Sequence, residues 1–223
     1  MQRRIVRVYD VDGTLSDSIK QNHCTTVEAH RHFNLIPPTL EELRDKYDQS
    51  NGFKDFELAI RVPEKLIPEY NKHWWGTFCN IMKKNPPIII PGARGELHRL
   101  ASLGAYLILL TKATERDTDL MLGMAWVRSV FNETIFVDNQ IDKTDAMKEL
   151  KSRMNGDSLI YFGDTRSDGQ ACLASGIKFG AMIHEYSYNS ERMLMEFVKM
   201  SNGSAVAVKG VTDFQKSAED AFR

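Results

Sequence analysis

The sequence predicts an α/β fold, in which helices sandwich an open parallel sheet and an all-helical segment interrupts the chain near its start. Three apolar runs, at residues 5–9, 105–110 and 158–162, have the length of buried strands, and each ends in polar residues. After residue 92 the pattern alternates between helices and strands, which is typical of parallel sheets. Ligands of such sheets bind beyond the carboxyl ends of the strands.

The first strand is predicted over residues 4–12, and its end carries two carboxylates, Asp10 and Asp12, before a turn at Gly13. Side chains two positions apart on a strand point to the same side, so we expect these carboxylates to emerge together. Two adjacent charges are costly there unless a cation or a reaction requires them. A helix cap or a solvated turn is the alternative interpretation of the pair.

The segment after this strand is helical in pattern. Its first helix is predicted over residues 17–34, capped by Ser16 or Asp17, and further helices are predicted at 40–47, 53–61 and 64–83. A helical stretch of roughly 70 residues is too long for a simple connection. We therefore expect a subdomain at residues 16–87, inserted into a core made of residues 1–15 and 88–223.

The remaining chain supplies the other core elements. Helices are predicted at 94–103, 115–127, 143–154, 168–175 and 190–200, and strands at 105–111, 134–137, 158–163, 178–183 and 205–209. Thr114 is the predicted N-cap of the second of these helices. The tail beyond residue 211 is amphipathic at best.

Polar residues also follow the second and third apolar runs. Thr111 and Lys112 end the second run, and Asp164 follows the third directly. Asp168, four residues later, suits the first turn of a helix. Because the carboxyl ends of parallel strands meet at one edge, we expect these residues near Asp10.

Composition indicates an ordinary globular protein. The 223 residues are 42% apolar and 26% charged, and 29 basic against 30 acidic residues leave a net charge of −1. This balance argues against binding to nucleic acid or an anionic membrane. No run approaches the ~20 apolar residues of a membrane span, and the basic start lacks a signal-peptide core. Three cysteines without metal-ligand spacing are typical of reduced, cytoplasmic proteins.

Four motifs, in order, resemble those of the haloacid dehalogenase-like hydrolases, most of which are phosphatases. The matching residues are Asp10-Val11-Asp12-Gly13-Thr14-Leu15, Thr111, Lys143, and Gly163-Asp164 with Asp168. The resemblance covers nearly the whole chain. Within this family the chain is similar in kind to the phosphoglycolate phosphatases. It implies a Rossmann-like core, a helical cap at residues 16–87, and hydrolysis of a small phosphorylated metabolite.

The resemblance implies covalent catalysis by the first motif. Asp10 is then the nucleophile that forms an aspartyl-phosphate. Asp12 is the general acid for the leaving oxygen and afterwards the base that activates water. Thr111 and Lys143 are the implied ligands of the phosphate group.

A Mg²⁺ cofactor is implied in the same way. Its ligands are Asp10, the backbone carbonyl of Asp12, and Asp164, because Mg²⁺ prefers oxygen ligands. Asp168 is either a further ligand through water or an orienting residue. It can also be a carboxylate favoured by the dipole at a helix N-terminus, and both interpretations can hold together.

Several positions keep alternatives. Thr111 can simply close its strand. Lys143 is favoured over Lys148 because a cation at a predicted helix start opposes the dipole and needs another reason to be there. Lys112 replaces an asparagine that is common in the family, and it either contacts the phosphate or faces solvent. In the cap, any of Arg44, Lys46 and Lys54 can reach the substrate or lie on a solvated face.

Other activities fit the same core. A sugar-phosphate mutase, a pyrophosphatase and a nucleotidase share its chemistry, and a non-catalytic phosphoester-binding protein is the alternative from another class. A dehalogenase is disfavoured because carbon–halogen displacement leaves Asp12 and Asp164 without a role. A phosphonate hydrolase requires a cap lysine for a Schiff base, and none stands out. The sequence leaves the oligomeric state open.

Overall fold

A computed structural model describes residues 4–49, 53–137 and 142–222. Within them six strands form one parallel sheet in the order β5-β4-β1-β6-β7-β8, which confirms the predicted fold class. The strands are β1 Ile5–Tyr9, β4 Tyr106–Thr111, β5 Glu133–Phe136, β6 Ser158–Gly163, β7 Lys178–Met182 and β8 Ala205–Val208. After β1 the chain adds β4 and β5 on one side of it and then β6, β7 and β8 on the other. Where the order of strands reverses in this way, a crevice opens at their carboxyl ends.

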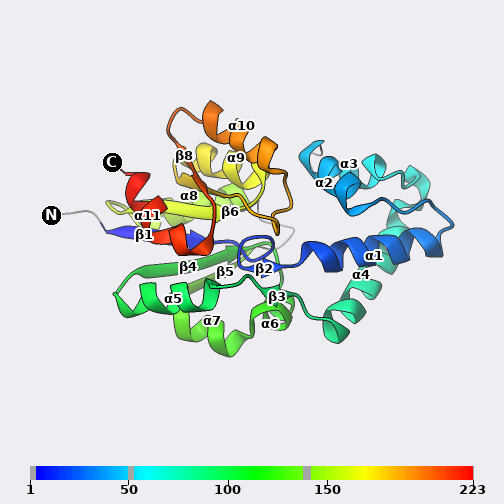
Figure 1. Ribbon diagram of the computed structural model, residues 1–223, viewed down its shortest axis with the longest axis horizontal. Coiled ribbons are helices and arrows are strands. Elements are labelled where there is room, and N and C mark those ends of the chain that lie inside the picture. The colour runs from blue at the N-terminus through cyan, green and yellow to red at the C-terminus, as the bar shows by residue number, and fades with distance from the viewer. Residues whose placement is uncertain (1–3, 50–52, 138–141, 223) are drawn as a thin grey trace.

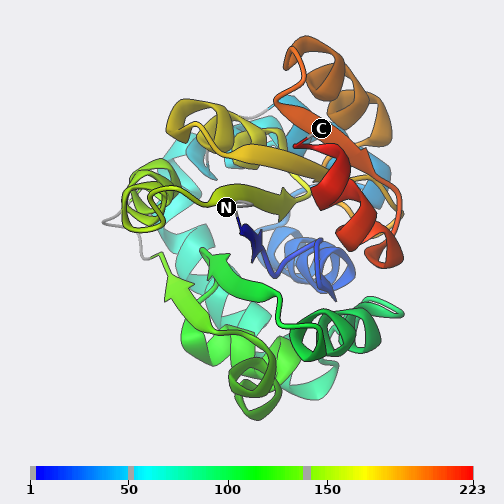
Figure 2. The ribbon, with the colours of Figure 1, turned by 90° about the vertical axis from the view of Figure 1, so that its left-hand side faces the viewer.

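Helices cover both faces of the sheet (Figure 2). The apolar cluster on one face includes side chains of α5 Ala93–Ser102, α6 Glu115–Leu122, α7 Met124–Val130 and α11 Phe214–Asp220. The cluster on the other includes side chains of α8 Lys143–Arg153, α9 Arg166–Ser175 and α10 Glu191–Met200. Alternation along β1 places Tyr9 in the first cluster and Val8 in the second, so the central strand is buried on both sides.

A helical insertion lies beyond the carboxyl ends of the strands, at the right of Figure 1. It consists of α1 Ile19–His32, α2 Leu40–Gln49, α3 Phe53–Ala59, the 3₁₀ turn Glu64–Leu66 and α4 Ile67–Lys84. Two short antiparallel strands, β2 Ser16–Asp17 and β3 Ile88–Ile89, pair where the chain leaves and re-enters the core. Trp74 of α4 donates a hydrogen bond from Nε1 to Thr26 Oγ1 of α1, at 3.1 Å.

The structure corrects two local predictions and adds detail to a third. The helix expected at 115–127 is two helices, because Gly123 between them adopts a φ of +78°. Neither Ser16 nor Asp17 caps α1: both belong to β2, and Ser18 takes the N-cap position. The tail contains a 3₁₀ turn at Val211–Asp213 and helix α11, whose Phe214 is fully buried.

Two other predictions hold locally. Thr114 caps α6, accepting a hydrogen bond at its Oγ1 from the backbone N–H of Asp117 at 3.1 Å. Cys24, Cys79 and Cys172 are free thiols. No helix in the described part of the chain combines the length and the apolar character needed to cross a membrane.

Candidate active site

Three neighbouring strands bring the predicted residues to one edge of the sheet. Asp10 directly follows β1, Thr111 is the last residue of β4, and Asp164 directly follows β6. The backbone N–H of Asp10 donates to the carbonyl of Phe162 at 3.0 Å, which continues the β1–β6 ladder up to the first carboxylate. The parallel register therefore aligns side chains that lie far apart in the sequence.

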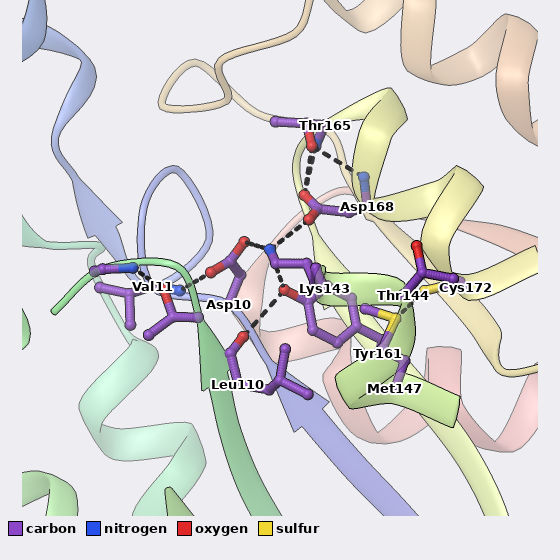
Figure 3. Close-up of polar contacts among 12 residues, drawn as sticks. Asp10, Val11, Leu110, Lys143, Thr144, Met147, Tyr161, Thr165, Asp168 and Cys172 are labelled. Carbon is purple, nitrogen blue, oxygen red and sulfur yellow. Dashed lines mark hydrogen bonds and ion pairs between the residues drawn. The ribbon is translucent and has the colours of Figure 1, made fainter. Parts of the chain in front are cut away.

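Lys143, the first residue of α8, connects two of the carboxylates (Figure 3). Its Nζ donates to Asp10 Oδ2 and to Asp168 Oδ1, each at 2.6 Å, and to the Tyr161 hydroxyl at 2.8 Å. The Tyr161 hydroxyl donates in turn to the Leu110 carbonyl at 3.1 Å. Burial alone would lower the pKa of Lys143, but the two carboxylates outweigh burial and raise that pKa. The ammonium therefore stays charged.

Asp168 belongs both to a helix cap and to this cluster. Its Oδ2 accepts hydrogen bonds from the hydroxyl and backbone N–H of Thr165, at 2.6 and 3.2 Å, and its own N–H donates to Thr165 Oγ1. This reciprocal pair is a capping box for α9. Its Oδ1 accepts from Lys143, so both carboxylate oxygens already have protein partners. Asp168 is thus both a capping carboxylate of α9 and a partner of Lys143.

Asp164 lies under the tight turn that contains Gly13. Its Oδ2 accepts the backbone N–H of Tyr188 at 2.6 Å. Gly13 has a φ of +64°, and a Cβ at this position would lie 2.0 Å from Asp164 Oδ2. Only glycine fits here, because it tolerates the left-handed backbone and leaves room for the carboxylate.

Asp10, Asp164 and Asp168 form an oxygen-rich group that suits a cation. One carboxylate oxygen from each lies within 4.8 Å of the others. Burial, with the nearby charge of Asp168, raises the pKa of Asp164 well above its usual range. A divalent cation would offset this cost, and an all-oxygen donor set is the kind that Mg²⁺ prefers. The residues present therefore fit a magnesium ion.

Asp12 occupies a different environment from Asp10. The strand β1 ends at Tyr9, before both carboxylates, so the alternation of side chains expected over residues 4–12 does not orient them. Asp12 Oδ1 accepts a hydrogen bond from the Ser18 hydroxyl at 2.5 Å. Burial raises the pKa of Asp12 to about 6, against the lowering effect of the Ser18 hydrogen bond. The Ser18 hydroxyl is also 2.9 Å from the Tyr188 hydroxyl.

The two residues at the end of β4 differ in burial. Thr111 is buried, and its Oγ1 accepts the backbone N–H of Ala113 at 3.1 Å. Lys112 is exposed and takes part in none of the described hydrogen bonds of the cluster. Lys148, the second candidate for the site lysine, is exposed on α8 and pairs with Asp145 at 3.3 Å. Of these two lysines, Lys143 contacts the carboxylates at the sheet edge and Lys148 lies on the surface.

The helical insertion contacts the core beside this site. Arg44 of α2 donates a hydrogen bond from its guanidinium to the backbone carbonyl of Glu185. The ring of Tyr47 meets the ring of Tyr188 edge to face, with centroids 5.0 Å apart. Lys46 has an interaction partner. The side chain of Lys54 lies outside the described part of the structure.

Three participants have no clear sequence motif. Tyr161 lies within the apolar stretch Leu159–Phe162 of β6, and its hydroxyl was its only signal. Ser18 and Tyr188 lie 6 residues from Asp12 and 24 residues from Asp164 respectively. Ser18 stands between β2 and α1, and Tyr188 is brought to the site by the loop after β7. Local patterns encode neither position.

Comparisons with known proteins agree with this geometry. Residues 7–182 match the family model described as haloacid dehalogenase-like hydrolase. A phosphoglycolate phosphatase of Pseudomonas fluorescens is 25% identical over 208 residues, which cover 87% of this chain and 75% of that protein.

Two solved structures share the fold. A haloacid dehalogenase-like family hydrolase from Streptococcus pneumoniae has a TM-score of 0.75 at 16% identity, covering 94% of this chain and 96% of that one. A predicted phosphoglycolate phosphatase from Haemophilus somnus has a TM-score of 0.74 at 15% identity, with coverage of 97% and 98%. At these identities the likeness supports the fold alone.

Proposed function

We propose that this chain, which belongs to the haloacid dehalogenase-like hydrolase family, is a Mg²⁺-dependent phosphatase of a small phosphorylated metabolite. The predicted family, its phosphoglycolate phosphatase-like character and the hydrolase class are confirmed by the comparisons. The cofactor, the residue roles and the substrate class are our proposal. One observation carries it: buried Lys143 holds Asp10 and Asp168 beside Asp164 at the carboxyl edge of the sheet.

The first step is phosphoryl transfer to Asp10. A carboxylate oxygen of Asp10 attacks phosphorus, and the bond from phosphorus to the leaving oxygen breaks. Asp12 gives its proton to that oxygen, and a carboxyl whose pKa is raised to about 6 is suited to this task. In the second step Asp12, now ionised, takes a proton from water as the water attacks the aspartyl-phosphate. Phosphate leaves and Asp10 is restored.

The other cluster residues bind and neutralise. Lys143 and the hydroxyl of Thr111 contact the phosphate oxygens, and Asp168 orients Lys143 through their 2.6 Å ion pair. Mg²⁺ would be held by Asp10, the Asp12 carbonyl and Asp164, and it supplies positive charge against the phosphate. Asp168, whose oxygens already have partners, would act on the ion through water.

The helical insertion is proposed to be a cap. Residues 16–87 leave and re-enter the core through the β2–β3 pair, and Arg44 and Tyr47 contact the loop that carries Tyr188. These contacts support a cap that excludes water from the site and shapes the substrate pocket. The free cysteines support a cytoplasmic location.

Phosphate release from a panel of esters tests this function. The panel contains phosphoglycolate, sugar phosphates, nucleoside monophosphates and pyrophosphate, each with Mg²⁺ and with EDTA. We expect release from at least one small monoester, lost with EDTA and lost in Asp10→Asn. Asp145→Asn, an exposed change on α8, is the matched control and should retain activity. Release that persists with EDTA, or silence across the panel from folded protein, would contradict the proposal.

A further inference from the structure

Arg7 is a buried cation that the proposed reaction does not use. It lies in the middle of β1, only 8% exposed, and its side chain faces the same side of the sheet as Tyr9. Among the described residues, its side chain donates one hydrogen bond, from a terminal nitrogen to the carbonyl of Ile5, at 3.2 Å. Within residues 4–49, 53–137 and 142–222, its Nε–H has no acceptor and no carboxylate pairs with it.

A buried guanidinium without a carboxylate is unusual. Removing a charge from water is costly, so buried charges are as a rule paired. Glu96 of α5, which packs on the same face of the sheet, is already bound by Arg99 at 2.7 Å. The protein itself therefore leaves most of the donors of Arg7 unused.

Arg7 also lines a cavity of about 270 Å³. Two guanidinium groups line it, and that of Arg4 is ion-paired with Asp157 at 2.6 Å, outside the lining, so Arg7 is its uncompensated cation among the described residues. Apolar and aromatic surface comes from Ile5, Leu100, Leu103 and Tyr106, and no lining residue is Asp or Glu. The guanidinium of Arg4 lies 4.5 Å from the centre of the Tyr106 ring. Ile5 begins β1 and Arg4 precedes it, so the cavity is at the opposite end of this strand from Asp10, away from the helical insertion (Figure 1).

We propose that this cavity binds a small organic anion, in which a carboxylate or phosphate group is attached to an apolar body. The planar donors of Arg7 match either oxyanion in a bidentate manner. The apolar body would lie against Leu100, Leu103 and the Tyr106 ring, and a volume of about 270 Å³ accommodates only a small ligand. This site does not depend on the function proposed for the opposite end of the sheet.

Isothermal titration calorimetry of the full chain tests the site. The probes are benzoate and phenylphosphonate, with benzyl alcohol as the neutral control. Arg7→Met removes the charge and introduces an unbranched apolar side chain, which is suited to a buried position because burying an unpaired charge is costly. Arg31→Met, on the exposed surface of α1, is the matched control. Leu103→Glu adds a negative charge at an exposed position of the lining and provides a second variant if Arg7→Met does not fold.

We expect saturable binding of at least one anion to the wild type, and none of benzyl alcohol. Arg7→Met and Leu103→Glu should each weaken that binding by about tenfold or more, as expected for loss of a charge-assisted hydrogen bond. Arg31→Met should leave it unchanged. If only benzoate or only phenylphosphonate depends on Arg7, the site is specific for that oxyanion. Absence of binding by both anions, or affinities that Arg7→Met and Leu103→Glu leave unchanged, would overturn the proposal.

Discussion

At the scale of single residues, the two carboxylates of the first motif differ in the side chains that contact them. Asp10 is ion-paired with Lys143, whereas Asp12 accepts a hydrogen bond from the neutral hydroxyl of Ser18. Burial raises the pKa of Asp12 to about 6, which favours a group that exchanges protons near neutrality. Environment, more than residue type, assigns the two different roles.

Asp12→Asn should therefore reveal its role through the leaving group. An alkyl phosphate, whose departing oxygen needs a proton, should lose ~10²–10⁴-fold in kcat. p-Nitrophenyl phosphate, with an acidic leaving group, should lose much less in its first step. Single-turnover release of alcohol and of p-nitrophenol measures that step. Equal losses on both esters would mean that Asp12 does not act as the general acid.

Tyr188 positions Asp12 through Ser18. Its hydroxyl lies 2.9 Å from that of Ser18 and also accepts a hydrogen bond from Asn22. Tyr188→Phe removes these contacts and keeps the backbone N–H that donates to Asp164. We expect kcat to fall about fivefold, since one hydrogen bond contributes ~1 kcal/mol, with KM little changed. Tyr186→Phe, in the same loop, should keep the kcat of the wild type. A kcat of Tyr188→Phe equal to that of Tyr186→Phe would refute this role.

At the scale of elements, helix α8 distinguishes its two candidate lysines. Lys143 begins the helix and faces the sheet edge, 8% exposed, whereas Lys148 lies one turn later with 56% exposure. Lys143→Met would leave Asp10 and Asp168 facing each other without their cation. We expect a loss of ~3–5 kcal/mol in unfolding free energy, as for other broken buried ion pairs.

Lys148→Met is the control for this change. Its ion pair with Asp145 is exposed, so the unfolding free energy should change by less than ~1 kcal/mol. Urea denaturation of both variants and the wild type measures the difference. A Lys143→Met protein as stable as Lys148→Met would show that the buried pairs contribute nothing to folding.

The turn after β1 gives a second prediction at this scale. Gly13→Ala introduces a Cβ 2.0 Å from Asp164 Oδ2, in addition to the strain of a positive φ. Gly156→Ala has a similar backbone, with φ +95°, but meets no atom within 4 Å. The strain alone should cost ~1–2 kcal/mol in each variant. We expect Mg²⁺ to raise the melting temperature of the wild type, and only Gly13→Ala should also lose this increase.

That melting experiment separates backbone strain from damage to the site. If Gly13→Ala and Gly156→Ala respond to Mg²⁺ as the wild type does, the close packing of Gly13 on Asp164 does not matter for the metal. If both lose the response, the effect is one of general instability. The prediction requires a loss in Gly13→Ala alone.

At the scale of the whole molecule, the apolar runs predict the sheet well because buried parallel strands need nearly continuous hydrophobic sequence. β1, β4 and β6 lie within one to three residues of their expected bounds. The same local patterns miss the two-residue β2–β3 pair, whose formation depends on the chain leaving and re-entering the core at one point. They also miss the break at Gly123, since a single glycine does not always end a helix.

The site shows a similar division. Asp10, Asp164 and Lys143 follow from motifs at strand and helix ends, where topology brings them together. Tyr161 and Tyr188 contact them only through tertiary packing, from the middle of a strand and from a loop. Sequence patterns thus identify residues whose position in an element is sufficient, and not those recruited by folding.

The central claim is that phosphate passes through Asp10, and rapid acid quench tests it most directly. The wild type is mixed with Mg²⁺ and a ³²P-labelled ester from the panel, stopped within one turnover and digested. The account predicts label on the peptide that contains Asp10, removable by hydroxylamine as an acyl phosphate should be. The label should be absent from Asp10→Asn and longer-lived in Asp12→Asn. If the wild type turns over the ester but neither the wild type nor Asp12→Asn yields a labelled peptide, phosphate transfer through Asp10 is contradicted.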